Sequence, residues 1–169
     1  MTTIVITENG VFADTRITTQ KYVDGEIVSE IFTLSKKIRK TQKYIFTGCG
    51  SSALVNCFKN RFTKNAICLF GFSFNVLKDC RYSDMATVFI KDSNGSHIFD
   101  IKSIHLFLNF YIVIIKNEWV LRKNDICIMG SGSDYAKEFL KNNDDPIAAI
   151  KYAALKDKFT NFTVQRFFF

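Results

Sequence analysis

The chain begins with a strand pattern at its second residue. Apolar and polar side chains alternate from Thr2 to Thr7, as they do in a half-buried β-strand. Glu8-Asn9-Gly10 then supplies a turn that can adopt positive φ, and Val11 to Asp14 resumes the strand pattern. The sequence therefore predicts a β-hairpin that starts at residue 2.

A second hairpin and a helix are expected next. An extended stretch runs from Glu26 to Leu34, a basic turn follows, and Lys43 to Thr47 returns as a strand into Gly48-Cys49-Gly50. Two hairpins within the first fifty residues indicate a sheet. Ser51 can cap a helix that packs on this sheet, because apolar residues recur there at helical spacing with lysines opposite: Ala53, Leu54, Cys57, Phe58 and Phe62.

The rest of the chain predicts a second sheet and two closing helices. The expected strands are Met85 to Lys91, Ser96 to Ile101, Phe107 to Ile115, Glu118 to Leu121, Asp125 to Met129 and a terminal Phe162 to Phe167. The expected helices run from Ser133 to Lys141 and from Asp144 to about Phe159. Ala66 to Arg81 fits neither period. This order favours an α+β fold with two stacked, mainly antiparallel sheets between helical layers, an α/β/β/α sandwich.

Length and charge limit the function classes. The 169 residues suit a single domain, residues 1–169. The apolar run Leu106 to Ile115 is too short for a bilayer span, and the amino end lacks a secretory signal, so we expect a cytoplasmic protein without a membrane partner. The net charge of +7 permits an anionic partner, but the basic segment from Lys36 to Lys43 is most simply a solvated hairpin, and no nucleic-acid-binding framework is visible.

Cofactor and metal sites are not expected. The five cysteines show no Cys-x-x-Cys spacing, and the two histidines, His97 and His105, lie in apolar strand-like surroundings. Neither Gly48-Cys49-Gly50 nor Gly130-Ser131-Gly132-Ser133 has the Lys-Ser/Thr ending of a phosphate-binding loop. One residue does suggest chemistry. Thr2 follows Met1 on the first strand, where it could become an N-terminal nucleophile with its own α-amine as base.

Four separated blocks carry a family resemblance. They are Met1 to Val5 with Asn9-Gly10 and Ala13 to Arg16; Val28 to Phe32; Gly48 to Ala53; and Ile128 to Ala136 with Asp145 to Ile150 and Asp157 to Thr160. In this order they resemble the HslV peptidase and proteasome β subunits, especially the compact versions found in bacteriophage genomes. Residues 65–125 match only in outline. The resemblance implies the four-layer fold of N-terminal-nucleophile hydrolases.

The resemblance also assigns roles to individual residues. Thr2 would be nucleophile and base once Met1 is removed, with Asp14 orienting the site and Arg16 beside it. The oxyanion would bind a backbone N–H of Gly48 or Gly50. The threonine amine would be supported by Asp157 together with Ser131 or Ser133.

One position departs from the family pattern. About 16 residues after Asp14, where the family places a lysine, the sequence has Glu30. A lysine ammonium lowers the pKa of the neighbouring amine and hydroxyl, whereas a carboxylate favours the protonated amine. We therefore expect weak or absent peptidase activity, unless Glu30 itself acts as general base. A retained Met1 would also suppress the reaction, because the Thr2 nitrogen would then be an amide.

Two functions follow from these expectations. The first is a self-assembling threonine-type peptidase that cleaves peptide substrates within a homo-oligomeric ring, single or stacked, with an unfoldase as partner. The second is an inert structural or binding ring protein whose basic hairpin binds an anionic partner. Both would act in the cytoplasm, which is the host cytoplasm if the chain is viral.

Overall fold

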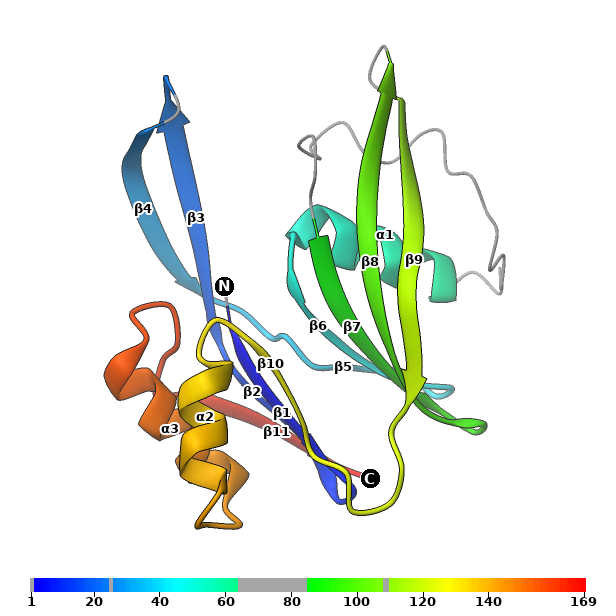
Figure 1. The fold of residues 1–169 in the computed structure, drawn as a ribbon, viewed down its shortest axis with the longest axis vertical. Coiled ribbons are helices and arrows are strands. Elements are labelled where there is room, and N and C mark those ends of the chain that lie inside the picture. The colour runs from blue at the N-terminus through cyan, green and yellow to red at the C-terminus, as the bar shows by residue number, and fades with distance from the viewer. Residues whose placement is uncertain (1, 25, 64–84, 108–109) are drawn as a thin grey trace. The chain divides into compact units, whose positions relative to one another are not determined.

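The computed structural model describes residues 2–24, 26–63, 85–107 and 110–169 (Figure 1). Contacts divide the chain into two compact units. The first extends to Arg39 and resumes over Lys123–Phe169, and the second is the continuous segment Lys40–Arg122. Each unit has its own sheet and its own helical cover, so each is described separately. The expectation of a single domain stays a prediction.

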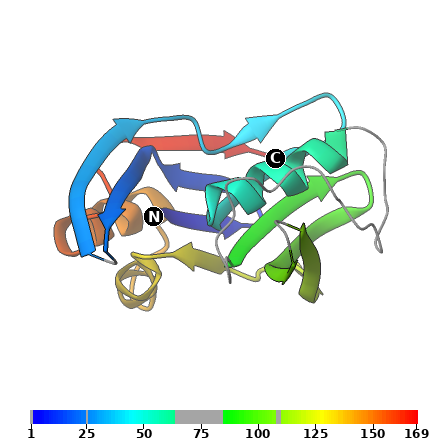
Figure 2. The same ribbon diagram turned by 90° about the horizontal axis from the view of Figure 1, so that it is seen from above.

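The first unit contains a four-stranded antiparallel sheet in the order β10-β1-β2-β11 (Figure 1, Figure 2). Its strands are β1 (Thr3–Thr7), β2 (Gly10–Asp14), β10 (Cys127–Gly130) and β11 (Val164–Phe168). The predicted opening hairpin is confirmed, because Thr7 pairs with Gly10 across a turn at Glu8 and Asn9. Every residue of β2 is buried, including the carboxylate of Asp14. The opening hairpin therefore forms the centre of this sheet.

Two helices, α2 (Ser133–Leu140) and α3 (Pro146–Lys156), pack on this sheet. Their shared core is formed by Val5, Phe12, Ala136, Ala149, Ile150 and Ala153. Asp145 caps α3, since its carboxylate accepts from the N–H groups of Ile147 at 2.8 Å and Ala148 at 3.0 Å. Helix α2 begins at Ser133, as predicted, and α3 begins at Pro146, two residues after the predicted start. The second ends earlier than expected, because Asp157 adopts an extended conformation at its C-cap.

A long two-stranded sheet completes the first unit. It pairs β3 (Arg16–Val23) with β4 (Glu26–Leu34) in antiparallel register. The bounds of β4 are those expected, but its partner is β3 and not the strand near Lys43 to Thr47. The polar run Thr18-Thr19-Gln20-Lys21 gives β3 little hydrophobic alternation, which explains why it was missed. The basic segment after Leu34 therefore does not form a hairpin turn between β4 and β6.

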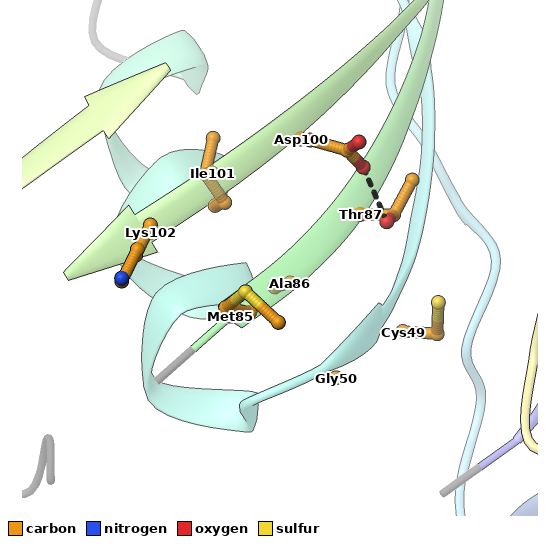
Figure 3. A pocket seen from close by; sticks show the side chains of 8 residues that line it. All are labelled: Cys49, Gly50, Met85, Ala86, Thr87, Asp100, Ile101 and Lys102. Carbon is orange, nitrogen blue, oxygen red and sulfur yellow. Dashed lines mark hydrogen bonds between the residues drawn. The ribbon is translucent and has the colours of Figure 1, made fainter. Parts of the chain in front are cut away.

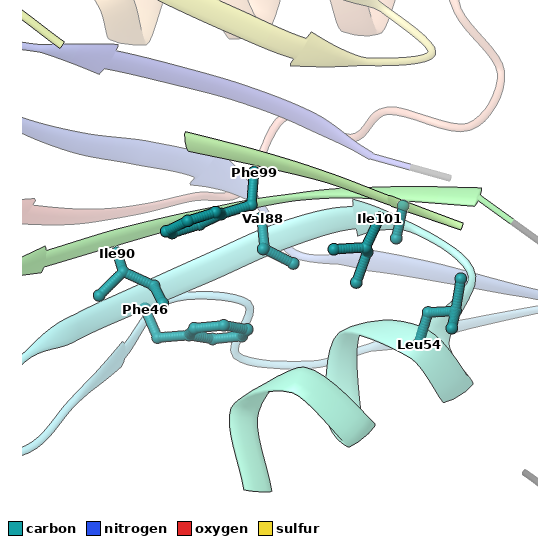
Figure 4. Close-up of a cluster of buried hydrophobic side chains, with 7 residues drawn as sticks. Phe46, Leu54, Val88, Ile90, Phe99 and Ile101 are labelled. Atoms are coloured by element: carbon teal, nitrogen blue, oxygen red, sulfur yellow. The ribbon is translucent and has the colours of Figure 1, made fainter. Parts of the chain in front are cut away.

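The second unit contains a five-stranded antiparallel sheet in sequence order, β5 to β9. Its strands are β5 (Arg39–Lys40), β6 (Ile45–Gly50), β7 (Met85–Asp92), β8 (Gly95–Phe107) and β9 (Phe110–Val120). Helix α1 (Ser52–Thr63) packs on this sheet and closes a core of Phe46, Leu54, Ala86, Val88, Ile90, Phe99 and Ile101 (Figure 4). The predicted turn at Asp92 to Gly95 is confirmed.

Two strand predictions in this region are corrected. β6 pairs with β7 and so belongs to the sheet that the sequence assigned only to later strands. β9 is one continuous strand where two shorter ones were expected. The ambiguous stretch from Ala66 to Arg81 lies outside the described residues. Within the described parts of the chain, no helix combines the length and apolarity needed to cross a membrane.

Candidate functional site

Thr2 and Asp14 meet because the opening hairpin folds back on itself. Ile4 pairs with Ala13, so the residues just beyond that pair lie side by side at the same end of the hairpin. The Thr2 hydroxyl donates to Asp14 Oδ1, and the Thr3 amide donates to the same oxygen at 2.8 Å. Asp14 Oδ2 accepts from the Arg16 amide at 2.9 Å. Asp14 is fully buried and Thr2 is 4% exposed.

A lysine completes this cluster. Lys37 Nζ lies 2.9 Å from Asp14 Oδ1 and also donates to Thr2 Oγ1. Its side chain is only 8% exposed. The ammonium compensates the buried carboxylate, which would otherwise carry a large desolvation cost. One hydroxyl thus contacts both members of a buried ion pair.

This arrangement suits activation of a hydroxyl nucleophile. An ammonium within hydrogen-bond distance of a hydroxyl oxygen stabilises the negative charge that develops there when the proton leaves. A carboxylate that binds the ammonium fixes the position of this positive charge beside the hydroxyl. Thr2 directly precedes β1, Asp14 is the last residue of β2, and Lys37 lies in the segment that follows β4.

Glu30 does not occupy the position expected of it. Its carboxylate accepts from Gln20 Nε2 at 2.7 Å and lies 3.2 Å from Lys158 Nζ. These hydrogen bonds, that of Gln20 first and that of Lys158 second, lower the pKa of Glu30. The resemblance places the lysine about 16 residues after Asp14, but the β3–β4 sheet takes up residues 16–34. The chain therefore returns to Asp14 only at Lys37, 23 residues further on.

A second polar cluster holds the backbone of Thr2. The Ser131 amide donates to the Thr2 carbonyl oxygen at 2.8 Å. The Ser131 hydroxyl donates to Asp157 Oδ2 at 2.6 Å, and the Thr160 hydroxyl donates to the same oxygen at 2.7 Å. Thr160 Oγ1 also lies 2.6 Å from Thr3 Oγ1. The structure thus brings Ser131 and Asp157 to the threonine strand and adds Thr160, to which the sequence analysis gives no role.

Ser133 and Arg16 are placed differently from these residues. Ser133 begins α2, and no hydrogen bond joins it to Thr2 among the described residues. Arg16 meets Asp14 through its backbone amide. Its guanidinium donates to the Lys158 carbonyl oxygen and lies 5.0 Å from the centre of the Phe32 ring. Arg16 therefore supports Asp14 through the backbone, while its charge is engaged elsewhere.

Two glycines permit the close approach of the loop after β10. Gly130 has φ +102°, and a Cβ there would overlap the carbonyl oxygen of Thr2. A Cβ at Gly132 would overlap the Thr3 hydroxyl and lie 2.9 Å from that of Thr160. Larger residues at these positions would push Ser131 away from Thr2. The Gly-Ser-Gly-Ser sequence is thus explained by packing around the threonine strand.

Gly48 and Gly50 belong to β6 in the second unit. Gly50 has φ +96°, and a Cβ there would lie 2.7 Å from the Ala86 Cα of β7. A Cβ at Gly48 would lie 2.9 Å from Val88 Cγ1 and 3.0 Å from the Thr87 carbonyl oxygen. Close pairing of β6 with β7 is sufficient to require both glycines, and their oxyanion-binding role stays a prediction.

The second unit also contains an open hollow of about 290 Å³ (Figure 3). Asp100 and Lys102 of β8 line it, and Asp100 accepts a hydrogen bond from the Thr87 hydroxyl at 2.6 Å. Cys49 and Gly50 of β6 line it as well. Across the described residues, no group of three or more His, Cys, Asp or Glu side chains is arranged to hold a metal ion.

Comparisons with known proteins bear on the fold. No protein-family model and no curated protein matches the sequence. Among solved structures, the chain is similar to a BPH, a bacterial proteasome homologue, from Thiobacillus denitrificans, solved in complex with epoxomicin. The similarity has a TM-score of 0.55 at 16% sequence identity and covers 99% of this chain and 97% of that chain. The fold of this chain is proteasome-like.

The comparison tests the resemblance at the level of the fold. The antiparallel sheets and few helices agree with the expected fold class. The similar structure is that of a bacterial protein, so the compact bacteriophage type stays a prediction. At 16% identity the likeness concerns the backbone, and the chemistry must be argued from Thr2, Asp14 and Lys37 themselves.

Proposed function

We propose that this chain is an N-terminal-threonine hydrolase that cleaves peptide bonds. The observation that carries the proposal is the buried contact of Lys37 Nζ with Thr2 Oγ1, held by Asp14. The expectation of weak activity depended on a carboxylate in the lysine's position. The pairing of Glu30 with Lys158, and the position of Lys37 beside Thr2, support activity once Met1 is removed.

The reaction begins when removal of Met1 frees the Thr2 α-amine. The Thr2 hydroxyl turns from Asp14 toward this amine, gives up its proton to it, and the oxygen attacks the carbonyl carbon of the substrate. The Lys37 ammonium stabilises the charge on the attacking oxygen. The protonated amine then transfers its proton to the leaving nitrogen, and an ester to Thr2 remains.

Water completes the cycle. The Thr2 amine takes a proton from a water molecule, which attacks the ester carbonyl and releases the acid product with the hydroxyl restored. Ser131 and Asp157 hold the Thr2 backbone throughout, because the Ser131 amide binds the Thr2 carbonyl oxygen. Thr2 thus acts as nucleophile and base, with Lys37 and Asp14 as its electrostatic support.

The proposal includes self-association and a four-layer α/β/β/α arrangement. Proteasome-like fold similarity supports both. The β3–β4 sheet adds a second argument for self-association, since Ile27, Ile31 and Leu34 are 49%, 59% and 70% exposed. Large apolar side chains gathered on one exposed element are typical of protein interfaces. We expect copies of this chain to cover them, in a ring.

Labelling with epoxomicin tests the chemistry. The purified chain, with Met1 removed, is incubated with this compound and with short fluorogenic peptides, and adduct mass and initial hydrolysis rates are measured. We expect an adduct on the wild-type chain and none on Thr2→Ala. Lys37→Ala should lower the hydrolysis rate at least about 100-fold, the usual size of such an electrostatic contribution.

Lys36→Ala is the matched control, because Lys36 is the neighbouring lysine and its side chain is exposed. It should retain the wild-type rate. A Lys37→Ala variant as fast as wild type would contradict the proposal. Absence of both adduct and hydrolysis in a chain that starts at Thr2 would favour the inert ring protein.

A further inference from the structure

The segment that carries Lys37 needs backbone partners from elsewhere in the chain. It lies between β4 and β5, outside any strand, so it has no ladder of its own. Ser35 N donates to the Thr15 carbonyl oxygen at 2.8 Å. The next backbone groups depend on one side chain, that of Gln165.

The Gln165 amide makes three hydrogen bonds with this segment. Its Oε1 accepts from Lys37 N and from Ile38 N, each at 2.9 Å. Its Nε2 donates to the Ile38 carbonyl oxygen, also at 2.9 Å. A single side chain thus satisfies most of the polar backbone of two consecutive residues.

Gln165 is itself fixed relative to Asp14. It lies on β11 opposite Ala13 of β2, and the adjacent pair on the same strands is Val164 with Asp14. The strand that bears the carboxylate and the strand that bears Gln165 are therefore hydrogen-bonded neighbours. Lys37 is held at both ends, its backbone by Gln165 and its ammonium by Asp14.

From this geometry we propose that Gln165 is a positioning residue that sets the place of the Lys37 ammonium against Thr2 Oγ1. A lysine side chain has four flexible bonds, so anchoring its backbone limits where the ammonium can lie. Displacements of about 1 Å in such groups can cost about 100-fold in rate. The inference rests on the proposed function of Thr2 and Lys37.

Two substitutions separate positioning from mere stability. Gln165→Met keeps the side-chain length but removes all three hydrogen bonds. Gln165→Glu keeps the acceptor for the two N–H groups, loses the donor and adds a charge beside the segment. We expect the Met variant to lower kcat at least about 10-fold with a smaller change in KM. The Glu variant should lie between it and wild type, and its pH–rate profile should be shifted.

Gln20→Ala is the control, since it also removes a glutamine side chain, one that donates to Glu30 on the β3–β4 sheet. Melting temperatures are recorded for all variants. A Met variant with a lowered melting temperature but unchanged kcat and pH–rate profile would overturn the inference. If the Met variant does not fold, the Glu variant decides, and an unshifted profile at full rate would overturn it.

Lys37→Ala distinguishes this inference from the proposed function. Loss of rate in Lys37→Ala together with full rate in both Gln165 variants would reject the role of Gln165 alone. Full rate in Lys37→Ala would reject both.

Discussion

Asp14 has no exposed surface, so its carboxylate must find all of its partners within the protein. It accepts from Thr2, Thr3, Arg16 and Lys37. The first three of these residues lie within the opening hairpin or within two residues of its ends. Only Lys37 is distant, and it supplies the opposite charge. A buried carboxylate with this many donors is held in one orientation, which is what a site built around the Thr2 hydroxyl requires.

Glu30→Gln tests whether the nearby carboxylate takes part in the chemistry. Glu30 is bound to Gln20 and Lys158, so we expect the hydrolysis rate to stay within about 2-fold of wild type. A much larger loss of rate, measured with the same peptides, would place Glu30 in the reaction after all.

The same variant has a predicted pH dependence. The hydrogen bonds from Gln20 and Lys158 lower the folded-state pKa of Glu30, so its charged form stabilises the fold. That contribution is present above the unfolded-state pKa and is lost as the pH falls through the lowered folded-state pKa. Melting temperatures should therefore differ between wild type and Glu30→Gln at neutral pH and converge in acid. A gap that widens in acid would contradict this sign.

Lys37 shows why the site could be predicted only in part from the sequence. Thr2 and Asp14 lie on one hairpin, so local spacing was enough to bring them together. Lys37 follows a two-stranded sheet whose first strand, β3, shows no clear local pattern. Counting residues from Asp14 therefore selected Glu30. The signal that could have pointed to a lysine is Asp14 itself, since a carboxylate buried in a hairpin needs a cation as its partner.

The loop after β10 depends on a backbone conformation that favours glycine. Gly130 combines positive φ with a close approach to the Thr2 carbonyl oxygen, and the next residue donates its amide to that oxygen. The turn thus connects helix α2 to the threonine strand. Its geometry determines where the Thr2 backbone lies.

Gly130→Ala should both destabilise the fold and slow hydrolysis. The added Cβ overlaps the Thr2 carbonyl oxygen and the backbone is strained, so we expect a loss of more than about 2 kcal/mol in the free energy of unfolding. Gly95→Ala is the control, because Gly95 also has positive φ but its Cβ would meet only His97 Nε2 at 3.5 Å. Urea denaturation of both variants measures the free energy of unfolding. Equal losses in the two variants would contradict the importance of the close approach of Gly130 to the Thr2 carbonyl oxygen.

Helix α3 provides a separate test of element stability. Asp145→Ala removes the side chain that accepts from the Ile147 and Ala148 amides, and should cost about 1 kcal/mol. Asp144→Ala is the matched control, since Asp144 is exposed and lies one residue before the cap. Thermal unfolding of the two variants should show a lower melting temperature only for Asp145→Ala.

Elements with explicit end signals were predicted best. Glu8-Asn9-Gly10 marks the end of the first turn, and Asp145-Pro146 marks the start of α3. Strand β3 has no such signal inside it, and the pairing of β6 with β7 is set by long-range packing around α1 that no local pattern encodes. The sequence therefore predicted where elements lie more successfully than which strands pair.

The molecule is built from two units, one formed by two separate segments of the chain and the other by a single segment. The second is one uninterrupted segment, Lys40–Arg122, inserted into the first. Thr2, Asp14, Lys37, Ser131 and Asp157 all belong to the first unit. The proteasome-like fold makes self-association plausible, and the assembly is the remaining property to measure.

Mass spectrometry should show both processing and assembly. Denaturing spectra of the protein purified from cells should give a chain lighter by one methionine, because a free Thr2 amine is required as base. Native spectra should give a complex of several chains. Ile31→Lys, at an exposed position of β4, should shift the complex toward monomer while leaving the chain folded. A monomeric wild type would contradict self-association.

The insertion of one unit into the other also sets an order of events during synthesis. Thr2 and Asp14 are translated first, Lys37 soon after, and Asp157, Thr160 and Gln165 only after the whole inserted segment has been made. Strand β11 must then pair with β2 before Gln165 can bind the backbone of Lys37. If Thr2 is the nucleophile, as proposed, we expect the nascent chain to stay inactive until β11 has been made, because Gln165 and Asp157 are translated only after the inserted segment.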